Sequence, residues 1–212
     1  MKRPRDDQVQ PTPVRRRRGL ARMALVLDAA ATEFAAVGYD RATTNSIAER
    51  AQISPGSLYQ YFSDKAAIAS ALAQRYVNEL VVSQAGTFSE LGDELAALPL
   101  PEVIERIIDP LIAFNVQHPA FLILFARKDV PELLSGAVQP MEDAFAGRIA
   151  DVIQRRNPSI PKTRIDAVTE TSILVFRGLM IGVSTLVPED RERRATEAKA
   201  AITGYLQHRS IL

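Results

Sequence analysis

Five positions between 57 and 65 that we expect to be exposed carry side chains that can donate a hydrogen bond: Ser57, Tyr59, Gln60, Tyr61 and Lys65. A solvated helical face more often carries Glu and Lys, so this run of donors is unusual. Donors of this kind suit the phosphate oxygens of DNA and the acceptor atoms on its base edges. The chemistry that the stretch favours is non-covalent recognition of a nucleic acid.

The rest of the chain offers no set of residues for catalysis. It contains no Cys, and its two His residues, His118 and His208, lie far apart, which argues against a metal site. Neither a phosphate-binding Gly loop nor a Ser in a nucleophile elbow occurs. We therefore expect no enzyme, no metal and no cofactor. The alternative from another class is an all-α enzyme or small-molecule-binding protein without regulatory DNA binding.

Two short helices must position the donors. Thr43 and Thr44 can cap the first helix, and Ser54 can cap the second, with Pro55 at its first helical position. The small residue Ala48 precedes the turn, where two crossing helices need close approach. This layout predicts a helix-turn-helix, whose second helix enters the major groove of DNA. An ordinary helical hairpin is the alternative.

Within this unit we assign a role to each polar group. Ser57 and Gln60 are candidates for base edges, since Gln can bond adenine through two hydrogen bonds, and Gly56 would allow close approach. Phosphate contacts are assigned to side chains on both sides of the turn. The full candidate DNA-binding set is Arg17, Arg18, Thr43, Thr44, Asn45, Ser54, Pro55, Gly56, Ser57, Tyr59, Gln60, Tyr61 and Lys65.

Charge separates the two parts of the chain. Residues 1–65 hold 11 Lys and Arg against 7 Asp and Glu, a net charge of +4, whereas residues 66–212 carry a net charge of −3. Residues 1–18 form a predicted disordered arm that ends in the run Arg15–Arg18. Such a run is often only solvated, but here it precedes the helix-turn-helix and is at least as well suited to reach phosphates or the minor groove.

The segment from Gly38 to Lys65 closely resembles the TetR (tetracycline-repressor-like) transcriptional regulators. The resemblance rests on Gly38-Tyr39-Asp40, Thr43-Thr44, the run from Ile47 to Ala51 and the run from Ile53 to Lys65, and it extends over about 45 residues from Ala21. The family's turn usually holds Gly where this chain has Gln52. If that position needs a positive φ, Gln52 carries mild strain.

Apolar residues recur at helical spacing along the chain, so we expect an all-α fold of about nine helices. Residues 19–65 form the predicted DNA-binding domain, with one helix from Leu20 to Val37 that Gly38 ends. A long helix from Ser63 to about Gln84 joins it to residues 66–212, a predicted antiparallel helical domain for ligand binding and dimerisation. No apolar run spans a membrane and no secretory signal occurs, so we expect a cytoplasmic protein without a membrane partner.

The last two helices, predicted over Lys162–Val187 and Glu189–His208, suggest a homodimer. The first of them is apolar on more than one face and must be buried on most sides. In a chain of this size the extra face packs most simply against a second subunit, as the resemblance also implies. A central core helix in a monomer is the alternative.

The resemblance implies an unidentified small-molecule effector bound among the middle helices in a mostly apolar pocket with a few polar groups. Each Phe taken singly fits a core residue better than a ligand wall, and Arg177, a cation in an apolar run, needs a partner. The candidate ligand-binding set is Phe88, Phe114, Asn115, His118, Phe121, Phe125, Met141, Phe145, Arg148 and Arg177. The sequence thus favours a ligand-responsive repressor of a palindromic operator over a non-specific architectural DNA binder, which would carry more net charge.

Overall fold

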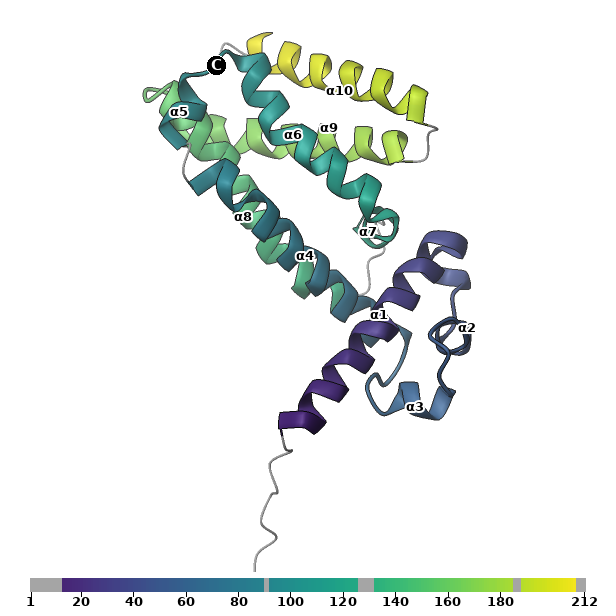
Figure 1. Ribbon diagram of the computed structural model, residues 1–212. Helices are drawn as coiled ribbons and strands as arrows, with labels where there is room; N and C mark the ends of the chain where they lie inside the picture. The colour runs from purple at the N-terminus through teal and green to yellow at the C-terminus, as the bar shows by residue number, and fades with distance from the viewer. Residues whose placement is uncertain (1–12, 90–91, 126–131, 185–187, 209–212) are drawn as a thin grey trace, which may run out of the picture.

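The computed structural model describes residues 13–89, 92–125, 132–184 and 188–208, and within these ranges every regular element is a helix. The all-α prediction is confirmed. Figure 1 shows α1, α2 and α3 gathered as a head at one end and α5, α6, α9 and α10 at the other, with α4 running between them. The helices are α1 (Pro13–Arg41), α2 (Thr44–Arg50), α3 (Pro55–Tyr59), α4 (Lys65–Ser89), α5 (Gly92–Ala97), α6 (Leu100–Gln117), α7 (Pro119–Phe125), α8 (Glu132–Arg156), α9 (Lys162–Ser184) and α10 (Pro188–His208).

The first helix begins earlier than the sequence predicted. Residues 13–18 belong to α1, so the predicted disordered arm is corrected for this part, while residues 1–12 lie outside the described chain. Pro13 stands at the first position, where its missing N–H is not needed, and the following Arg residues are good helix formers. Near the other end Gly38 adopts a φ of 79°, which kinks the helix before Arg41.

The head has a closed apolar core. Phe34 of α1, Ile47 and Ala48 of α2, and Leu58 of α3 are all fully buried. The same buried cluster continues through α4 into α6 and α7, and α1 packs directly against α7. The head therefore shares a continuous core with the body instead of joining it by a bare linker.

The long helix α4 begins with a well-formed cap. The Ala67 backbone N–H donates to Asp64 Oδ1 at 2.8 Å, and the Ser63 hydroxyl donates to Asp64 Oδ2 at 3.1 Å. These hydrogen bonds, the Ala67 N–H first, lower the pKa of Asp64 below its ordinary value. Asp64 is therefore the residue that caps α4, which begins at Lys65 and not at Ser63 as the sequence predicted.

A second buried cluster forms the body. Its members come from α5, α6, α8, α9 and α10 and include Ile160 in the loop after α8, and α8 lies along both α4 and α9. Three half-buried residues pack against both clusters: Ile112 of α6, Phe145 of α8 and Phe176 of α9. The two cores are thus in contact through a small set of large side chains. Among the described residues, no helix combines the length and apolarity that crossing a membrane would require.

Candidate functional site

Local hydrogen bonds hold α2 and α3 in place. The Thr43 hydroxyl accepts a bond from the Ser46 N–H at 3.0 Å, and the Ser46 hydroxyl in turn accepts from the Thr43 N–H at 3.0 Å, so that the two residues form a capping box. In α3 the Ser57 N–H donates to the Ser54 hydroxyl at 3.1 Å, and Pro55 occupies the first turn. Both predicted helix starts are therefore present, with Thr43 engaged in capping.

The turn between α2 and α3 closes through two backbone bonds. The Ile53 N–H donates to the Ala48 carbonyl and the Gln52 N–H donates to the Glu49 carbonyl, each at 3.0 Å. These bonds are the pair that defines a Schellman motif, in which the residue after the C-cap takes a left-handed conformation. That residue is Gln52, with a φ of 54°, and it is the one non-glycine residue with positive φ in the described ranges. The turn keeps the geometry that Gly usually supports, and Gln52 bears the strain.

We therefore expect Gln52→Gly to raise the free energy of unfolding by about 0.5–1 kcal/mol, because relief of left-handed strain outweighs the extra entropy of glycine in the unfolded chain. Urea denaturation followed by circular dichroism measures this change. Gln74→Gly, in the exposed middle of α4, is the matched control and should lower stability by about 1 kcal/mol. Equal effects of both variants would contradict the strain at Gln52.

The exposed side of the helix-turn-helix carries paired hydroxyls. Tyr59 Oη and Thr44 Oγ1 lie 3.0 Å apart, and Ser54 Oγ and Ser57 Oγ lie 2.9 Å apart. Each pair holds two hydroxyl protons and uses one in its mutual bond, so the other can point outward to an acceptor. Asn45, Gly56 and Gln60 are also exposed on this unit. The structure thus brings the predicted recognition residues together on one short segment.

Lys65 forms hydrogen bonds within the chain. Its ammonium group donates to the backbone carbonyls of Tyr39, Asp40 and Ala42 at 2.8, 3.1 and 2.9 Å, and it lies 4.5 Å from the centre of the Tyr39 ring. An ammonium group has three donors, and all three are engaged here. Lys65 therefore joins the start of α4 to the chain that follows the Gly38 kink, and its contact with DNA phosphates stays a prediction.

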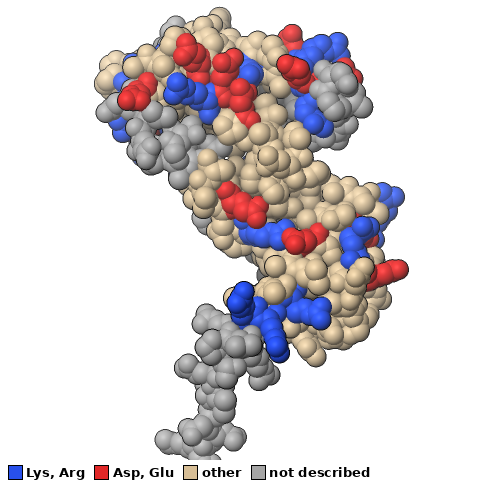
Figure 2. Space-filling view, viewed as in Figure 1, with Lys and Arg blue, Asp and Glu red and all other residues tan. Residues whose placement is uncertain are grey.

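Positive charge gathers at the beginning of α1. Figure 2 shows Lys and Arg side chains grouped without acidic ones beside the grey N-terminal segment. The exposed arginines in this part of α1 are Arg17, Arg18 and Arg22. Tyr61 lies close by, since a Cβ atom at Gly19 would stand 4.0 Å from its ring, and it packs half-buried against the head core. The basic end of α1 is therefore adjacent to the residues that follow α3.

The predicted aromatic ligand pocket is closed by its own side chains. Phe114, His118 and Phe121 form a cluster with the fully buried Tyr76 of α4, with ring centres 4.4–6.2 Å apart. Edge-to-face pairs at such distances are stabilising core contacts. Burial also raises the pKa of the Tyr76 hydroxyl. These predicted ligand residues therefore serve as the core that joins α4, α6 and α7.

The other predicted ligand residues are dispersed. The Asn115 amide donates to the Leu111 carbonyl at 2.7 Å, as Asn often does within a helix. Arg148 and Arg177 are half-buried and each already takes part in an interaction within the chain. The side chains of Phe88, Phe125 and Met141 lie outside the described residues. Nor do the described residues contain a group of His, Asp and Glu side chains that could hold a metal ion.

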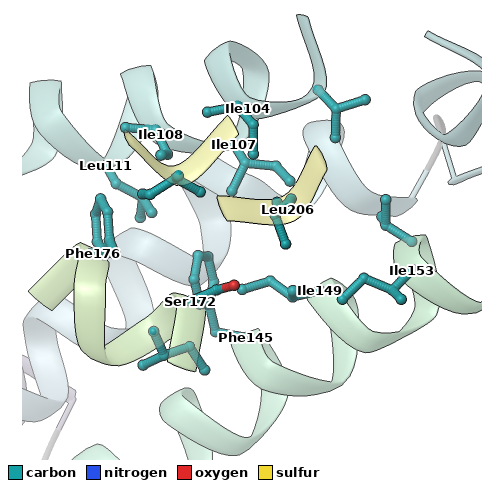
Figure 3. Close-up of a pocket in the computed structure, with 14 residues that line it drawn as sticks. Ile104, Ile107, Ile108, Leu111, Phe145, Ile149, Ile153, Ser172, Phe176 and Leu206 are labelled. Carbon is teal, nitrogen blue, oxygen red and sulfur yellow. The ribbon is translucent and has the colours of Figure 1, made fainter. Parts of the chain in front are cut away.

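A cavity of about 50 Å³ lies elsewhere in the body, between α6, α8, α9 and α10. Of the predicted ligand residues, Phe145 lines it. Its one polar lining residue is Ser172, which is 7% exposed and whose hydroxyl has no hydrogen-bond partner. Figure 3 shows this hydroxyl pointing among the apolar side chains of the wall. The full lining is Val103, Ile104, Ile107, Ile108, Leu111, Phe145, Ile149, Val152, Ile153, Ser172, Ile173, Phe176, Ile202 and Leu206.

Sequence reasoning missed this cavity for a physical reason. The stripe of Ile104, Ile107, Ile108 and Leu111 has the spacing of any buried helical face, and periodicity cannot distinguish a filled core from a cavity wall. Ser172 was the available signal, because it is a hydroxyl at the start of a long apolar run in α9. A buried hydroxyl needs a partner or carries a cost in free energy.

Comparison with known proteins agrees with this architecture. Residues 26–72 match the family model described as bacterial regulatory proteins, tetR family, and residues 99–206 match that of the tetracyclin repressor-like C-terminal domain. The second match alone covers about half of the chain. The first match includes α2, α3 and the first part of α4, and the second runs from α6 to α10.

The individual proteins that resemble this chain share only a modest sequence identity with it. The chain is 26% identical over 160 residues to the A-factor receptor protein of Streptomyces griseus, which covers 74% of this chain and 52% of that protein. It is 35% identical over 79 residues to an HTH-type transcriptional repressor of Mycobacterium tuberculosis, which covers 36% and 42%. The chain thus spans about half the length of these relatives. The transcriptional regulator FadR from Bacillus subtilis, solved in complex with stearoyl-CoA, has the same fold, with a TM-score of 0.65, 14% identity and coverage of 86% and 96%.

Proposed function

Because this chain belongs to the TetR family of bacterial regulatory proteins, we propose that it represses transcription from a palindromic operator and that a small-molecule effector releases it. One observation carries the DNA-binding part. The head exposes Asn45, Gly56, Tyr59 and Gln60 on a well-capped helix-turn-helix, next to an arginine-rich helix end. Such an arrangement combines base readout with phosphate neutralisation.

The roles within the head follow from exposure and hydrogen bonding. Gln60 at the C-cap of α3 is exposed and suits a base edge, and Gly56 at the helix start allows close approach. The spare hydroxyl proton of the Tyr59–Thr44 pair suits a phosphate oxygen, and that of the Ser54–Ser57 pair suits an acceptor on a base edge, the role predicted for Ser57. Arg17 and Arg18 would reach phosphates or the minor groove beside the site.

We infer that the protein acts as a homodimer through α9 and α10. A recognition helix of five residues, α3, reads few base pairs, so specificity requires two heads on an inverted repeat. Leu174 of α9 is a large apolar side chain that is 58% exposed in the single chain. Burial against a second subunit would remove this apolar surface from water.

The effector part rests on the body. The FadR relative binds stearoyl-CoA, and the Streptomyces griseus relative is named a receptor, so we infer that this chain also responds to a small molecule. Its cavity is bounded by α8, and α8 packs along α4, which carries the head. A ligand that separates α8 from α6 would shift α4 and change the distance between the two heads. The ligand must bind the DNA-incompetent state more tightly for this to work.

Selection of binding sites from random duplexes tests the proposal. We expect the full chain to enrich an inverted repeat, to bind it at least about tenfold more tightly than a scrambled duplex, and to lose affinity as salt rises, because phosphate contacts release counterions. Fluorescence anisotropy at several salt concentrations measures both affinities. Equal affinity for the repeat and the scrambled duplex would contradict a sequence-specific regulator.

Two substitutions on α3 separate base readout from phosphate contact. We expect Gln60→Ala to relax preference at one base position of each half-site, with a loss of about 1–3 kcal/mol of discrimination there. Tyr59→Phe removes only a hydroxyl assigned to phosphate, so it should weaken binding to all sequences alike. Anisotropy against a set of single-base operator variants measures both effects. If Gln60→Ala lowers the affinity for all operator variants equally, Gln60 contacts the phosphate backbone of DNA and not a base.

A further inference from the structure

We propose that the cavity between α6, α8, α9 and α10 binds an uncharged, mainly aliphatic part of the effector and that the Ser172 hydroxyl forms its one hydrogen bond there. The inference rests on the proposed function, since it specifies the chemistry of the effector. The observation that carries it is the Ser172 hydroxyl, which is buried, has no partner and points into an otherwise apolar cavity.

The Ser172 hydroxyl lacks a hydrogen bond that the helix would permit. A Ser in a helix can donate to the carbonyl one turn earlier, and Thr171 does so, bonding the Ala167 carbonyl at 2.8 Å. Ser172 makes no such bond, although its neighbour shows that this helix permits one. A buried hydroxyl without a partner raises the free energy of the folded protein. A ligand oxygen that pairs with it would recover that free energy on binding.

Water does not fit this place well. A buried water molecule needs two to four polar partners, whereas the cavity lining offers one hydroxyl among aliphatic and aromatic side chains. Apolar walls hold water weakly and accept apolar molecules. The wall therefore favours a ligand segment with aliphatic carbon and a single carbonyl or hydroxyl oxygen.

A charged group does not fit either. The lining contains no Lys, Arg, His, Asp or Glu, so a carboxylate or ammonium group would lose its hydration without a counter-charge. An effector that carries a charge must keep that charge outside this cavity. The buried part is thus an alkyl chain or ring with a ketone, ester or hydroxyl oxygen.

The size of the cavity links binding to movement. A cavity of about 50 Å³ is much smaller than the roughly 300–1,000 Å³ of a typical ligand pocket, so a whole effector requires the walls to separate. Phe145 and Phe176 line the cavity and also pack against the core shared with the head. Displacement of these two rings would therefore disturb the core that includes residues of α4 and α7.

The test uses 2-octanone as a neutral probe and octanoate, at pH 7, as its charged counterpart. In the full chain labelled at isoleucine methyl groups, 2-octanone should shift the signals of Ile104, Ile107 and Ile149, with smaller shifts at Ile47 in the head. Titration should show octanoate binding at least tenfold more weakly than 2-octanone. No shift at the cavity methyl groups, or equal binding of octanoate, would overturn the proposal.

Two substitutions on α9 test the hydroxyl itself. Ser172→Ala should weaken 2-octanone binding about three- to tenfold while leaving the melting temperature of the free protein unchanged or higher, because it removes an unpaired buried hydroxyl. Thr169→Val is the matched control: the Thr169 hydroxyl is equally buried and unpaired but does not line the cavity. Unchanged affinity in Ser172→Ala, or the same loss in Thr169→Val, would overturn the role of Ser172.

Operator affinity measured on the same samples separates this inference from the proposed function. If 2-octanone occupies the cavity and operator affinity does not change, the ligand chemistry stands and effector control through this cavity fails. If 2-octanone fails to bind while the chain still binds its operator, the ligand chemistry fails and the DNA-binding function stands.

Discussion

Replacing Lys65 with Met should lower the free energy of unfolding by about 2–3 kcal/mol. The side chain keeps its length and loses the ammonium group, so three backbone carbonyls lose a charged donor at once. Two of these hydrogen bonds are partly buried, at Tyr39 and Ala42, where water replaces the donor incompletely. The contact with the Tyr39 ring is lost as well. Urea denaturation followed by circular dichroism measures the change.

The matched control is Lys162→Met, since Lys162 is also the first residue of a long helix and is exposed. We expect this variant to unfold within about 0.5 kcal/mol of the original protein. The experiment also separates two roles for Lys65. A lysine that bound phosphate alone would lose DNA affinity on substitution and keep its stability. Normal stability with lost DNA affinity would therefore support the phosphate role and show that the three hydrogen bonds of Lys65 add little to stability.

The fold was predictable because its signals are local. Caps at Thr43 and Ser54, the Pro at position 55 and apolar spacing each act within one or two turns of helix, and the structure contains each of them. The predicted start of the first helix differs from the structure, because the local signal for a helix start at Pro13 is weak beside the polar and charged residues around it. Pro13 belongs to the predicted disordered arm, yet Pro is favoured at the first position of a helix, and α1 begins there.

The candidate sites were less predictable because they depend on contacts between distant segments. Lys65 lies 23–26 residues along the chain from the carbonyls that it binds, and the residues next to it in the sequence do not indicate these contacts. Phe114 and Phe121 were candidates for a ligand wall, and only the packing of Tyr76 from α4 shows that they fill a core. Ser172 became notable because no carbonyl or side chain in the described chain meets its hydroxyl. The sequence indicates which residues are apolar or polar, but the packing of distant segments determines which of them fill a core and which line a cavity.

Gly56→Leu should abolish tight operator binding without loss of stability. A Cβ atom at Gly56 would meet no atom nearer than the Ser54 hydroxyl, at 4.0 Å, and the backbone there is not left-handed. Leu is also a better helix former than Gly by about 0.8–1 kcal/mol. The folded head therefore tolerates the larger side chain, and the free energy of unfolding should stay unchanged or rise.

The expected loss arises only on DNA. Gly56 is the second residue of α3 and is exposed, so in the proposed complex it lies where the start of the recognition helix approaches the duplex. A Leu side chain would hold α3 away from the bases and forfeit the base contacts, so we expect affinity for the selected operator to fall about 100-fold or more, toward non-specific binding. Affinity for a scrambled duplex should change far less, because charge attraction acts over a longer range.

Gly147→Leu is the matched control, since Gly147 of α8 is also exposed, has nothing within 4 Å of an added Cβ, and lies in the body. Anisotropy titration of both variants against both duplexes decides the matter: an operator affinity for Gly56→Leu equal to that of Gly147→Leu would mean that the start of α3 does not face DNA.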